Sequence, residues 1–304
     1  MLFRSKRRFL QANFDHFRQA LMWEPRGHAD MYGCHLTEPD SPESDLGVIF
    51  LHNEGYSTMC GHGIIALTKV VLDLGIIQKE GREVTLRIDT PAGQVISRAV
   101  REDNQVSQVS FQNVPSFVVT LDETIDVPGL GSLHYDLAFG GAFYAFLRAE
   151  ELGLKLIPTD FKKIVELGIK LKQAIAARQP VRHPHSEDLS FLYGVIIVGP
   201  PREPHHHSRN VCIFAEGEVD RSPTGTGVSA RAAIHFARGE LTRGEEFTVE
   251  SLIDTCFTGR VVATTQFGPY PAVIPEVRGE AFLVGKSEFF LDPRDPLQHG
   301  FFLR

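Results

Sequence analysis

Two short segments of this chain are versions of one another. Residues 59–66 read Met-Cys-Gly-His-Gly-Ile-Ile-Ala, and residues 223–230 read Pro-Thr-Gly-Thr-Gly-Val-Ser-Ala. Each places one S–H or O–H group before Gly-x-Gly and then continues into a run that predicts a helix. The first copy carries a thiol, Cys60, where the second carries a hydroxyl, Thr224. A thiol can act as a base near neutral pH and an alcohol essentially cannot, so the pair points to chemistry with one base.

The duplication extends beyond the two turns. The tripeptide Ile-Asp-Thr recurs at residues 88–90 and 253–255. Its aspartate follows Cys60 by 29 residues in the first copy and follows Thr224 by 30 residues in the second. Two matched features at nearly matched spacing indicate two related α/β halves. We therefore expect pseudo-twofold symmetry and a site in the cleft between the halves.

Hydrophobic periodicity predicts the elements around the turns. The expected helices are residues 6–22, 64–74, 160–177 and 228–238, and Gly75 and Gly239 are expected to cap the second and fourth of them. The expected strands are residues 48–52, 84–88, 94–100, 106–111, 194–198 and 211–214. Residues 114–132, rich in proline, glycine and β-branched side chains, are expected to cross between the halves. The predicted domains are a first half, 1–116, joined by the C-terminal segment 285–304, and a second half, 117–284.

The bulk composition narrows the class of protein. The 304 residues are 42% hydrophobic and 23% charged, as in a globular protein with a substantial core. A net charge of −7 argues against a nucleic-acid-binding role, and no apolar run has the length of a membrane span. Four widely separated cysteines do not form a disulfide framework, which favours a reducing, cytoplasmic location.

A Gly-x-Gly sequence that opens a helix can bind an anion. The first backbone N–H groups of a helix have no partner in the helix, and the helix dipole is positive at that end. Two such ends facing one cleft can hold a small carboxylate from both sides, and the same field favours a thiolate at Cys60. On spacing alone, a structural cap explains such turns as well as a site does. Neither turn fits a P-loop or a dinucleotide-binding fingerprint.

Other polar residues near the turns are candidates for the same site. Asp220 precedes Thr224 by four residues, close enough to pair with a substrate amine, although a turn-stabilising role is the alternative. His62 can donate to the same ligand or be merely structural. Three adjacent histidines at 205–207 cannot easily converge on one metal ion, so no metal site is expected.

Five segments resemble the proline racemase family: residues 24–33, 52–63, 89–93, 139–141 and 220–227. The likeness covers nearly the whole chain in the expected order. It implies a diaminopimelate-epimerase-like fold, in which each half wraps strands around a central helix. It also implies removal of the α-proton of proline or hydroxyproline without any cofactor. The partner it implies is a small-molecule substrate, while the oligomeric state, a homodimer included, stays open.

The resemblance also implies roles for individual residues. Cys60 would accept the proton, Asp220 would hold the ring amine, and Phe214 would line the proline pocket. The groups implied to hold the carboxylate and its neighbours are Gly61, His62, Gly225 and Thr226.

Thr224 sets this chain apart from the racemases and epimerases, which carry cysteine in both turns. It resembles the branch that dehydrates trans-3-hydroxy-L-proline to Δ1-pyrroline-2-carboxylate. There Thr224 would fill space or form a hydrogen bond, because eliminating water needs no second acid. Proline racemase or 4-hydroxyproline epimerase activity, and a silent truncated form, are the alternatives. The chain also begins several tens of residues later than is usual in the family, so a strand at its start is expected to be missing.

Overall fold

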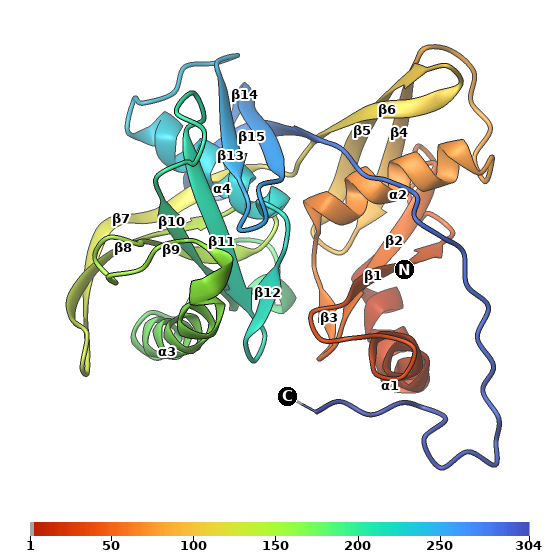
Figure 1. The fold of residues 1–304 in the computed structure, drawn as a ribbon. Helices are drawn as coiled ribbons and strands as arrows, with labels where there is room; N and C mark the ends of the chain where they lie inside the picture. Colours follow the sequence, from red (N-terminus) through yellow and green to blue (C-terminus); the bar gives the residue numbers. More distant parts are fainter. Residues whose placement is uncertain (1–2, 304) are drawn as a thin grey trace. The chain divides into compact units, whose positions relative to one another are not determined.

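The computed structural model describes residues 3–303 of the chain (Figure 1). The chain folds into two compact units. The first unit comprises residues 1–59, 63–109 and 280–304, and the second comprises residues 60–62 and 110–279. The segment Cys60–His62 therefore belongs to the second unit, although its neighbours in the chain belong to the first. Within the described part, no helix is long and apolar enough to cross a membrane.

The strands of the first unit form one sheet in the order β1-β2-β4-β5-β6, with the short β3 paired to β2. Their bounds are β1 Tyr32–Thr37, β2 Leu46–His52, β3 Tyr56–Ser57, β4 Glu83–Thr90, β5 Gly93–Glu102 and β6 Gln105–Gln112. The pairing of β2 with β4 is parallel, whereas β1 with β2 and β4 with β5 are antiparallel. Every residue of β2 is buried, which fits its continuous apolar sequence.

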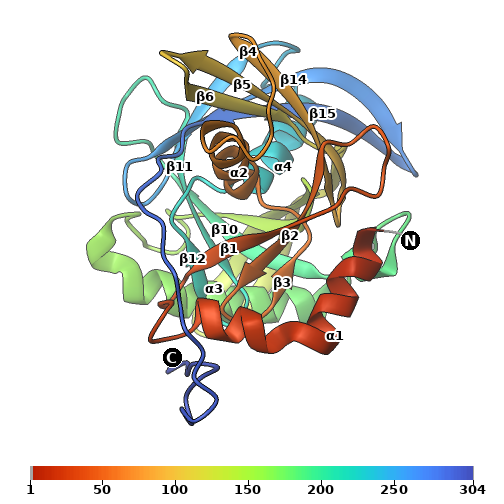
Figure 2. The same ribbon diagram turned by 90° about the vertical axis from the view of Figure 1, so that its right-hand side faces the viewer.

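Helix α1, Phe3–Met22, lies along β2 and β3 in Figure 2. A small apolar cluster joins it to the sheet, formed by Met22, Ile49, Leu51 and Tyr56. The buried Arg18 adds a polar tie, because its guanidinium donates to the carbonyl oxygens of residues 52 and 53. Residues 280–303 continue as an irregular segment, attached to the end of α1 by an isolated bridge between residues 24 and 301.

Helix α2, Gly61–Asp73, lies against β5 and β6 (Figure 2). Its apolar side chains Ile64, Ile65, Leu67, Val71 and Leu72 are buried. Polar contacts fix the helix at both sheet strands: the hydroxyls of Thr68 and Ser97 are 2.7 Å apart, and Asp73 accepts from the amide of Val106 at 2.8 Å. The predicted cap Gly75 follows the helix with a φ of 65°, as a left-handed C-cap requires.

The strands of the second unit form a closed barrel. Their order is β15-β14-β13-β11-β10-β9-β8-β7, and β15 pairs with β7 to complete the ring. Their bounds are β7 Ser116–Val127, β8 Gly131–Phe139, β9 Phe143–Arg148, β10 Leu192–Gly199, β11 Ser208–Phe214, β13 Glu246–Glu250, β14 Cys256–Phe267 and β15 Tyr270–Gly279. The short β12, Glu218–Asp220, pairs with β11 off this ring.

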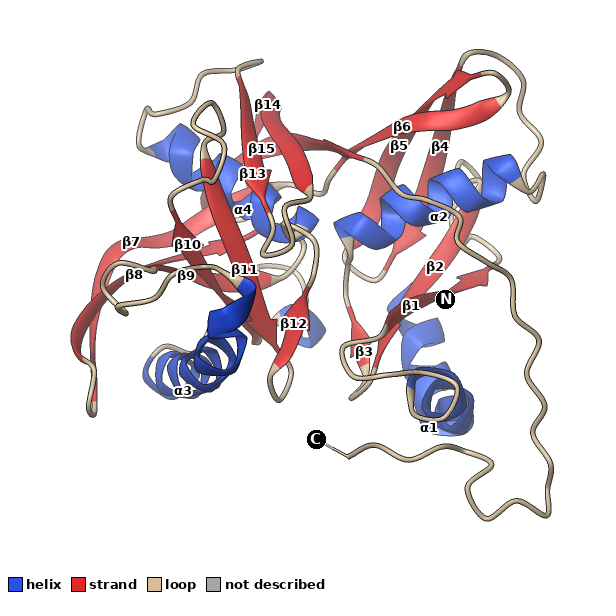
Figure 3. Ribbon diagram, in the orientation of Figure 1, coloured by secondary structure: helices blue, strands red, loops and turns tan. Residues whose placement is uncertain are grey.

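Helix α4, Gly225–Ala237, lies inside this barrel (Figure 3). Each of its residues from 225 to 235 is buried, because strands surround it on all sides. Helix α3, Phe161–Arg178, instead covers the outside of β10 and β11 with one apolar face. The short 3-10 helices η1, Pro158–Asp160, and η2, Glu187–Leu189, flank that helix. The barrel therefore holds the N-terminus of α4 in a rigid frame.

One predicted segment is wrong. Residues 114–132 do not form a crossover but fold as β7 and its hairpin into β8. Proline and glycine occur only at the ends of this segment, at 115, 128, 129 and 131, and its interior is a β-branched run. That interior pairs with β8 along one edge and with β15 through Phe117 on the other.

The repeated aspartates have structural partners in their own units. Asp89 is buried and accepts hydrogen bonds from the amides of Asp40 and Ser41, both at 2.9 Å, and from the hydroxyl of Ser44 at 2.7 Å. Asp254 has a φ of 65° and pairs with Arg209 of β11. The aspartates thus secure loops at the ends of strands in both units.

Candidate active site

Successive hydrogen bonds stabilise the turn that precedes α4. The Oδ1 atom of Asp220 accepts from the amide of Ser222 at 2.7 Å. The hydroxyl of Ser222 in turn accepts from the amide of Thr224 at 3.0 Å. The first helical bond follows, from the amide of Val228 to the carbonyl of Thr224 at 2.7 Å. These bonds fix the backbone before the first turn of the helix.

Thr224 occupies the N-cap position in a left-handed conformation, with φ 66° and ψ 90°. This backbone geometry is uncommon for a β-branched residue and indicates local strain. The side chain is 3% exposed, and its hydroxyl lies beside the buried thiol of Cys212, whose pKa it acts to lower through a side-chain hydrogen bond. The turn thus buries a polar group directly before the first amides of the helix.

The first backbone amides of α4 are suited to binding an anion. Those of Gly225, Thr226 and Gly227 precede the first helical bond and have no hydrogen-bond acceptor in the part of the chain that is described. Such amides at the positive end of a helix dipole form an anion site. A carboxylate can therefore bind at the N-terminus of α4.

The two Gly-rich turns meet within the second unit. A Cβ atom built on Gly61 would lie 2.8 Å from the Cα atom of Gly225, and one on Gly225 would lie 2.8 Å from the Cα atom of Gly61. Only glycine permits backbones to approach so closely. Cys60, next to Gly61, is half-buried and takes part in no disulfide within residues 3–303. The helix starts named in the two copies are thus neighbours in space.

The other predicted site residues differ in their surroundings. Phe214, at the end of β11, is buried and stacks on Tyr193, with ring centroids 5.3 Å apart. His62 is exposed and lies edge-on to Phe257 of β14 at 5.9 Å. Asp220 is half-buried and lies opposite Cys212 in the pairing of β12 with β11. Burial, reinforced by the charge of Asp220, raises the pKa of the Cys212 thiol well above its ordinary value.

Sequence reasoning missed Tyr144 of β9. Its phenol oxygen lies 2.7 Å from the hydroxyl oxygen of Thr226, and both residues are buried. Burial is the main cause that raises the pKa of this phenol well above its ordinary value. The apolar run 142–147 in which Tyr144 stands is typical of a core strand, and its partner lies 82 residues away in the sequence.

The turn between β8 and β9 supports the same end of α4. A Cβ atom on Gly140 would lie 2.2 Å from the carbonyl oxygen of Thr226 and 2.6 Å from the amide nitrogen of Ala230. The side-chain amide of Asn113 donates to the carbonyl of Gly140 at 2.7 Å and holds the turn in place. The segment 139–141 is therefore a packing element beside the helix start.

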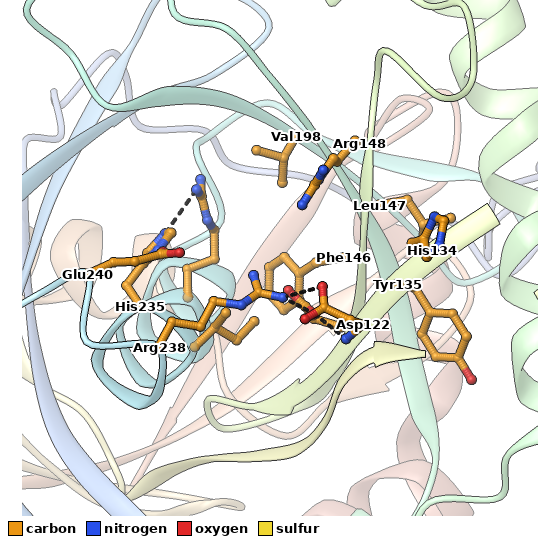
Figure 4. A pocket seen from close by; sticks show the side chains of 13 residues that line it. Asp122, His134, Tyr135, Phe146, Leu147, Arg148, Val198, His235, Arg238 and Glu240 are labelled. Atoms are coloured by element: carbon orange, nitrogen blue, oxygen red, sulfur yellow. Dashed lines mark hydrogen bonds and ion pairs between the residues drawn. The ribbon is translucent and has the colours of Figure 1, made fainter. Parts of the chain in front are cut away.

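A pocket of about 240 Å³ lies toward the C-terminal end of α4. Figure 4 shows the side chains that line it. Several of the charged groups that line it are paired: Arg238 contacts Asp122 and Asp136, and His235 contacts Glu240. None of the residues predicted for the site lines it. The cavity is distinct from the N-terminus of α4, where the candidate residues gather.

Comparison with known proteins gives a consistent result. Residues 2–302 match the model of the proline racemase family. The chain is 48% identical over 292 residues to a trans-3-hydroxy-L-proline dehydratase of Colwellia psychrerythraea, covering 96% of this chain and 82% of that protein. It is 43% identical over 299 residues to a 3-hydroxyproline 2-epimerase of Burkholderia multivorans, covering 98% and 89%.

A solved structure shares the fold. A hydroxyproline epimerase from Agrobacterium vitis with bound trans-4-hydroxy-L-proline superposes with a TM-score of 0.89 at 34% identity, covering 95% of this chain and 82% of that one. The predicted fold class, with strands wrapped around a central helix, is confirmed. The chain belongs to the proline racemase family.

Proposed function

We propose that this protein dehydrates trans-3-hydroxy-L-proline to Δ1-pyrroline-2-carboxylate, with Cys60 as the single base. The observation that carries the proposal is the pair of adjoining helix starts, of which one offers a thiol and the other the buried hydroxyl of Thr224. A threonine hydroxyl is neither ionised nor an effective acid near neutral pH, so it cannot serve as the second acid or base. One thiol suffices for elimination, whereas inversion of the α-carbon needs an acid and a base on opposite faces.

Substrate binding in this proposal uses the groups around α4. The free amides of its first turn, with Gly61 and His62 of the other turn, hold the carboxylate. The carboxylate of Asp220 holds the ring ammonium through Oδ2, because Oδ1 is occupied by the amide of Ser222. Phe214 offers an apolar wall to the ring.

The reaction then follows from the stereochemistry of the substrate. The hydroxyl and carboxylate of trans-3-hydroxy-L-proline lie on opposite ring faces, so the α-hydrogen and the hydroxyl share a face. The Cys60 thiolate, favoured by the start of α2, removes the α-hydrogen, and the electron pair forms the C2–C3 double bond. The C3–O bond breaks, and the Cys60 thiol returns its proton to the departing hydroxide as water. The enamine product tautomerises to the Δ1-imine.

The names of two relatives bear on this proposal. The Colwellia relative is named a dehydratase of this substrate, and the Burkholderia multivorans relative is named an epimerase of 3-hydroxyproline. If this chain were an epimerase, it would need a second acid at the position of Thr224. The threonine there favours the dehydratase.

A substrate series tests the proposal. The protein is incubated separately with trans-3-hydroxy-L-proline, L-proline and trans-4-hydroxy-L-proline, and the products are separated by chiral chromatography. We expect pyrroline-2-carboxylate from the first and no inversion of the other two. Cys60→Ser should lose turnover by at least about a thousandfold while it keeps the wild-type melting temperature. Inversion of L-proline, or full activity of Cys60→Ser, would overturn the assignment.

The location of the reaction is a further part of the proposal. None of the four cysteines takes part in a disulfide within the described residues, as is usual for proteins of a reducing compartment. We therefore place the enzyme in the cytoplasm, where it would serve amino-acid breakdown.

A further inference from the structure

Tyr144 and Thr226 form a hydrogen bond in the interior of the barrel, on the side of α4 that faces β9. The two oxygens are 2.7 Å apart, Tyr144 is 1% exposed and Thr226 is 2% exposed. This is the one partner that the described structure gives to either hydroxyl. Thr226 is the second residue of α4, so the bond reaches the helix turn whose amides are free.

From this geometry we infer that Tyr144 is a positioning residue that orients the hydroxyl of Thr226 toward the carboxylate of the substrate. The inference deepens the proposed function and rests on it. Tyr144 contacts the first turn of α4 through the hydroxyl of Thr226, and its effect on the substrate is transmitted by that hydroxyl.

In the proposed arrangement Tyr144 is the donor in this hydrogen bond and Thr226 is the acceptor. A hydroxyl can accept one hydrogen bond while it donates another. Burial keeps the phenol of Tyr144 protonated by raising its pKa well above the ordinary value, so it remains a donor throughout the working range. When the phenol donates to Thr226, the hydrogen of the threonine hydroxyl turns away from Tyr144. It is then available to an anion at the helix start.

The ring of Tyr144 is itself held from several sides. It lies edge-on to Tyr193, with centroids 5.7 Å apart, and contacts Phe146 at 6.3 Å. Tyr193 stacks on Phe214, the predicted wall of the substrate pocket. Gly140, from the turn just before β9, packs against the carbonyl oxygen of Thr226. One hairpin therefore fixes both the backbone and the hydroxyl of Thr226, which is the preorganisation that tight binding of a small ligand needs.

The test removes only the phenol oxygen, with Tyr144→Phe. Tyr135→Phe is the matched control: Tyr135 lies on the adjacent strand β8, is equally buried, and donates its phenol to Gln179 away from the helix start. Both variants lose one hydrogen bond of a buried tyrosine, so the loss of a phenol oxygen by itself is present in both. Calorimetry measures the affinity of each variant for two ligands that lack the 3-hydroxyl, L-proline and L-prolinamide.

L-prolinamide keeps the ring and the amine but replaces the carboxylate with a neutral amide. We expect Tyr144→Phe to weaken the binding of L-proline about tenfold (about 1.4 kcal/mol), because the Thr226 hydroxyl is then no longer held as a donor to the charged carboxylate. Its affinity for L-prolinamide should change less than about twofold. In turnover of trans-3-hydroxy-L-proline, KM should rise about tenfold with kcat nearly unchanged. Tyr135→Phe should bind both ligands as the wild type does.

A double variant tests whether Tyr144 acts through Thr226. Once Thr226→Val has removed the hydroxyl, adding Tyr144→Phe should cost less than about twofold in affinity for L-proline. Equal weakening of both ligands, additive losses in the double variant, or unchanged affinity in Tyr144→Phe would overturn the inference and leave the proposed function standing. A wild-type protein that neither binds L-proline nor converts trans-3-hydroxy-L-proline would instead overturn the proposed function, and the inference with it.

Discussion

Gly61 and Gly225 approach so closely that neither can carry a side chain: a Cβ atom on either would lie 2.8 Å from the Cα atom of the other. Each is the first residue of a helix that follows a Gly-rich turn. The residue before each glycine is the thiol-bearing Cys60 in one case and the hydroxyl-bearing Thr224 in the other. The close approach of the two glycines therefore sets the spacing between the Cys60 residue, which is the proposed base, and Thr224, which is not.

Gly61→Ala should disrupt this packing. Its methyl group would meet the backbone of Gly225 at 2.8 Å and the ring of Phe111 at 2.6 Å, and the backbone cannot rotate away as a side chain can. Overpacking of this kind lowers the free energy of unfolding by about 1–3 kcal/mol. It would also displace the proposed base, Cys60, and a misplaced catalytic group lowers the reaction rate strongly. We expect kcat/KM to fall at least about a hundredfold and the melting temperature by a few degrees. Gly285→Ala, where a Cβ atom meets nothing within 4 Å, is the control and should match the wild type in both measurements.

The duplicated turns were predictable because their signal is local. Gly-x-Gly before an apolar periodic run specifies a helix start, and the structure begins α2 at Gly61 and α4 at Gly225. Likewise, a glycine after the last periodic residue predicted the C-caps, and Gly75 and Gly239 both have positive φ. Such features depend on a few neighbouring residues and need no knowledge of distant contacts.

Asp220→Asn should separate the effect of the negative charge of Asp220 from the effect of its hydrogen bond in the turn. The asparagine Oδ1 atom can still accept from the amide of Ser222, so the turn keeps its brace, but the negative charge is lost. We expect KM for trans-3-hydroxy-L-proline to rise about 10- to 100-fold, with the melting temperature unchanged. Asp220→Ala removes the brace as well and should in addition lower the melting temperature. If Asp220→Asn binds substrate as the wild type does, Asp220 holds the turn and not the amine.

Thr224→Cys should add the second thiol that inversion requires. We expect the variant to convert a detectable part of L-proline to D-proline, while Thr224→Ser, which keeps a hydroxyl, should invert none. After incubation in ²H₂O, chiral chromatography measures inversion and mass spectrometry of the separated enantiomers measures deuterium at the α-carbon. Equal inversion by the serine and cysteine variants would show that the thiol is not the missing group.

Glu250 gives the second unit an acid-sensitive anchor. Burial acts to raise the pKa of this carboxyl, but donation by the amides of Arg202 and Glu203 and by the side chains of His206 and Arg209 outweighs it and lowers the pKa to about 2. Because the folded pKa lies below the ordinary value of 4.5, the stabilisation is complete above that value and is lost as pH falls toward 2.

Chemical denaturation between pH 6 and pH 2.5 checks this anchor. The wild type should lose up to about 3 kcal/mol from this group over the range, because each tenfold change in proton affinity is worth about 1.4 kcal/mol. Glu250→Gln should start less stable at pH 6 and show a flatter pH profile. Glu246→Gln, at the exposed start of the same strand, is the control and should retain the wild-type profile. Parallel profiles for wild type and Glu250→Gln would contradict the assignment.

The features that the sequence did not reveal depend on contacts between distant residues. The start of β7 pairs with β15, more than 140 residues later, and this pairing closes the barrel. Tyr144 stands in an apolar strand, and its role depends on a hydroxyl 82 residues away. Local composition can indicate that such segments are strands, but it does not indicate which distant residues they meet.

The most direct test of the single-base account is ¹H NMR of trans-3-hydroxy-L-proline incubated with the protein in ²H₂O. Elimination predicts that the substrate signals decay into those of Δ1-pyrroline-2-carboxylate, with deuterium at C3 taken up from solvent when the enamine tautomerises. It also predicts that no C2 epimer accumulates. Accumulation of the epimer with its 3-hydroxyl intact and deuterium at C2 would contradict the account, because it would require a second acid where the chain has Thr224.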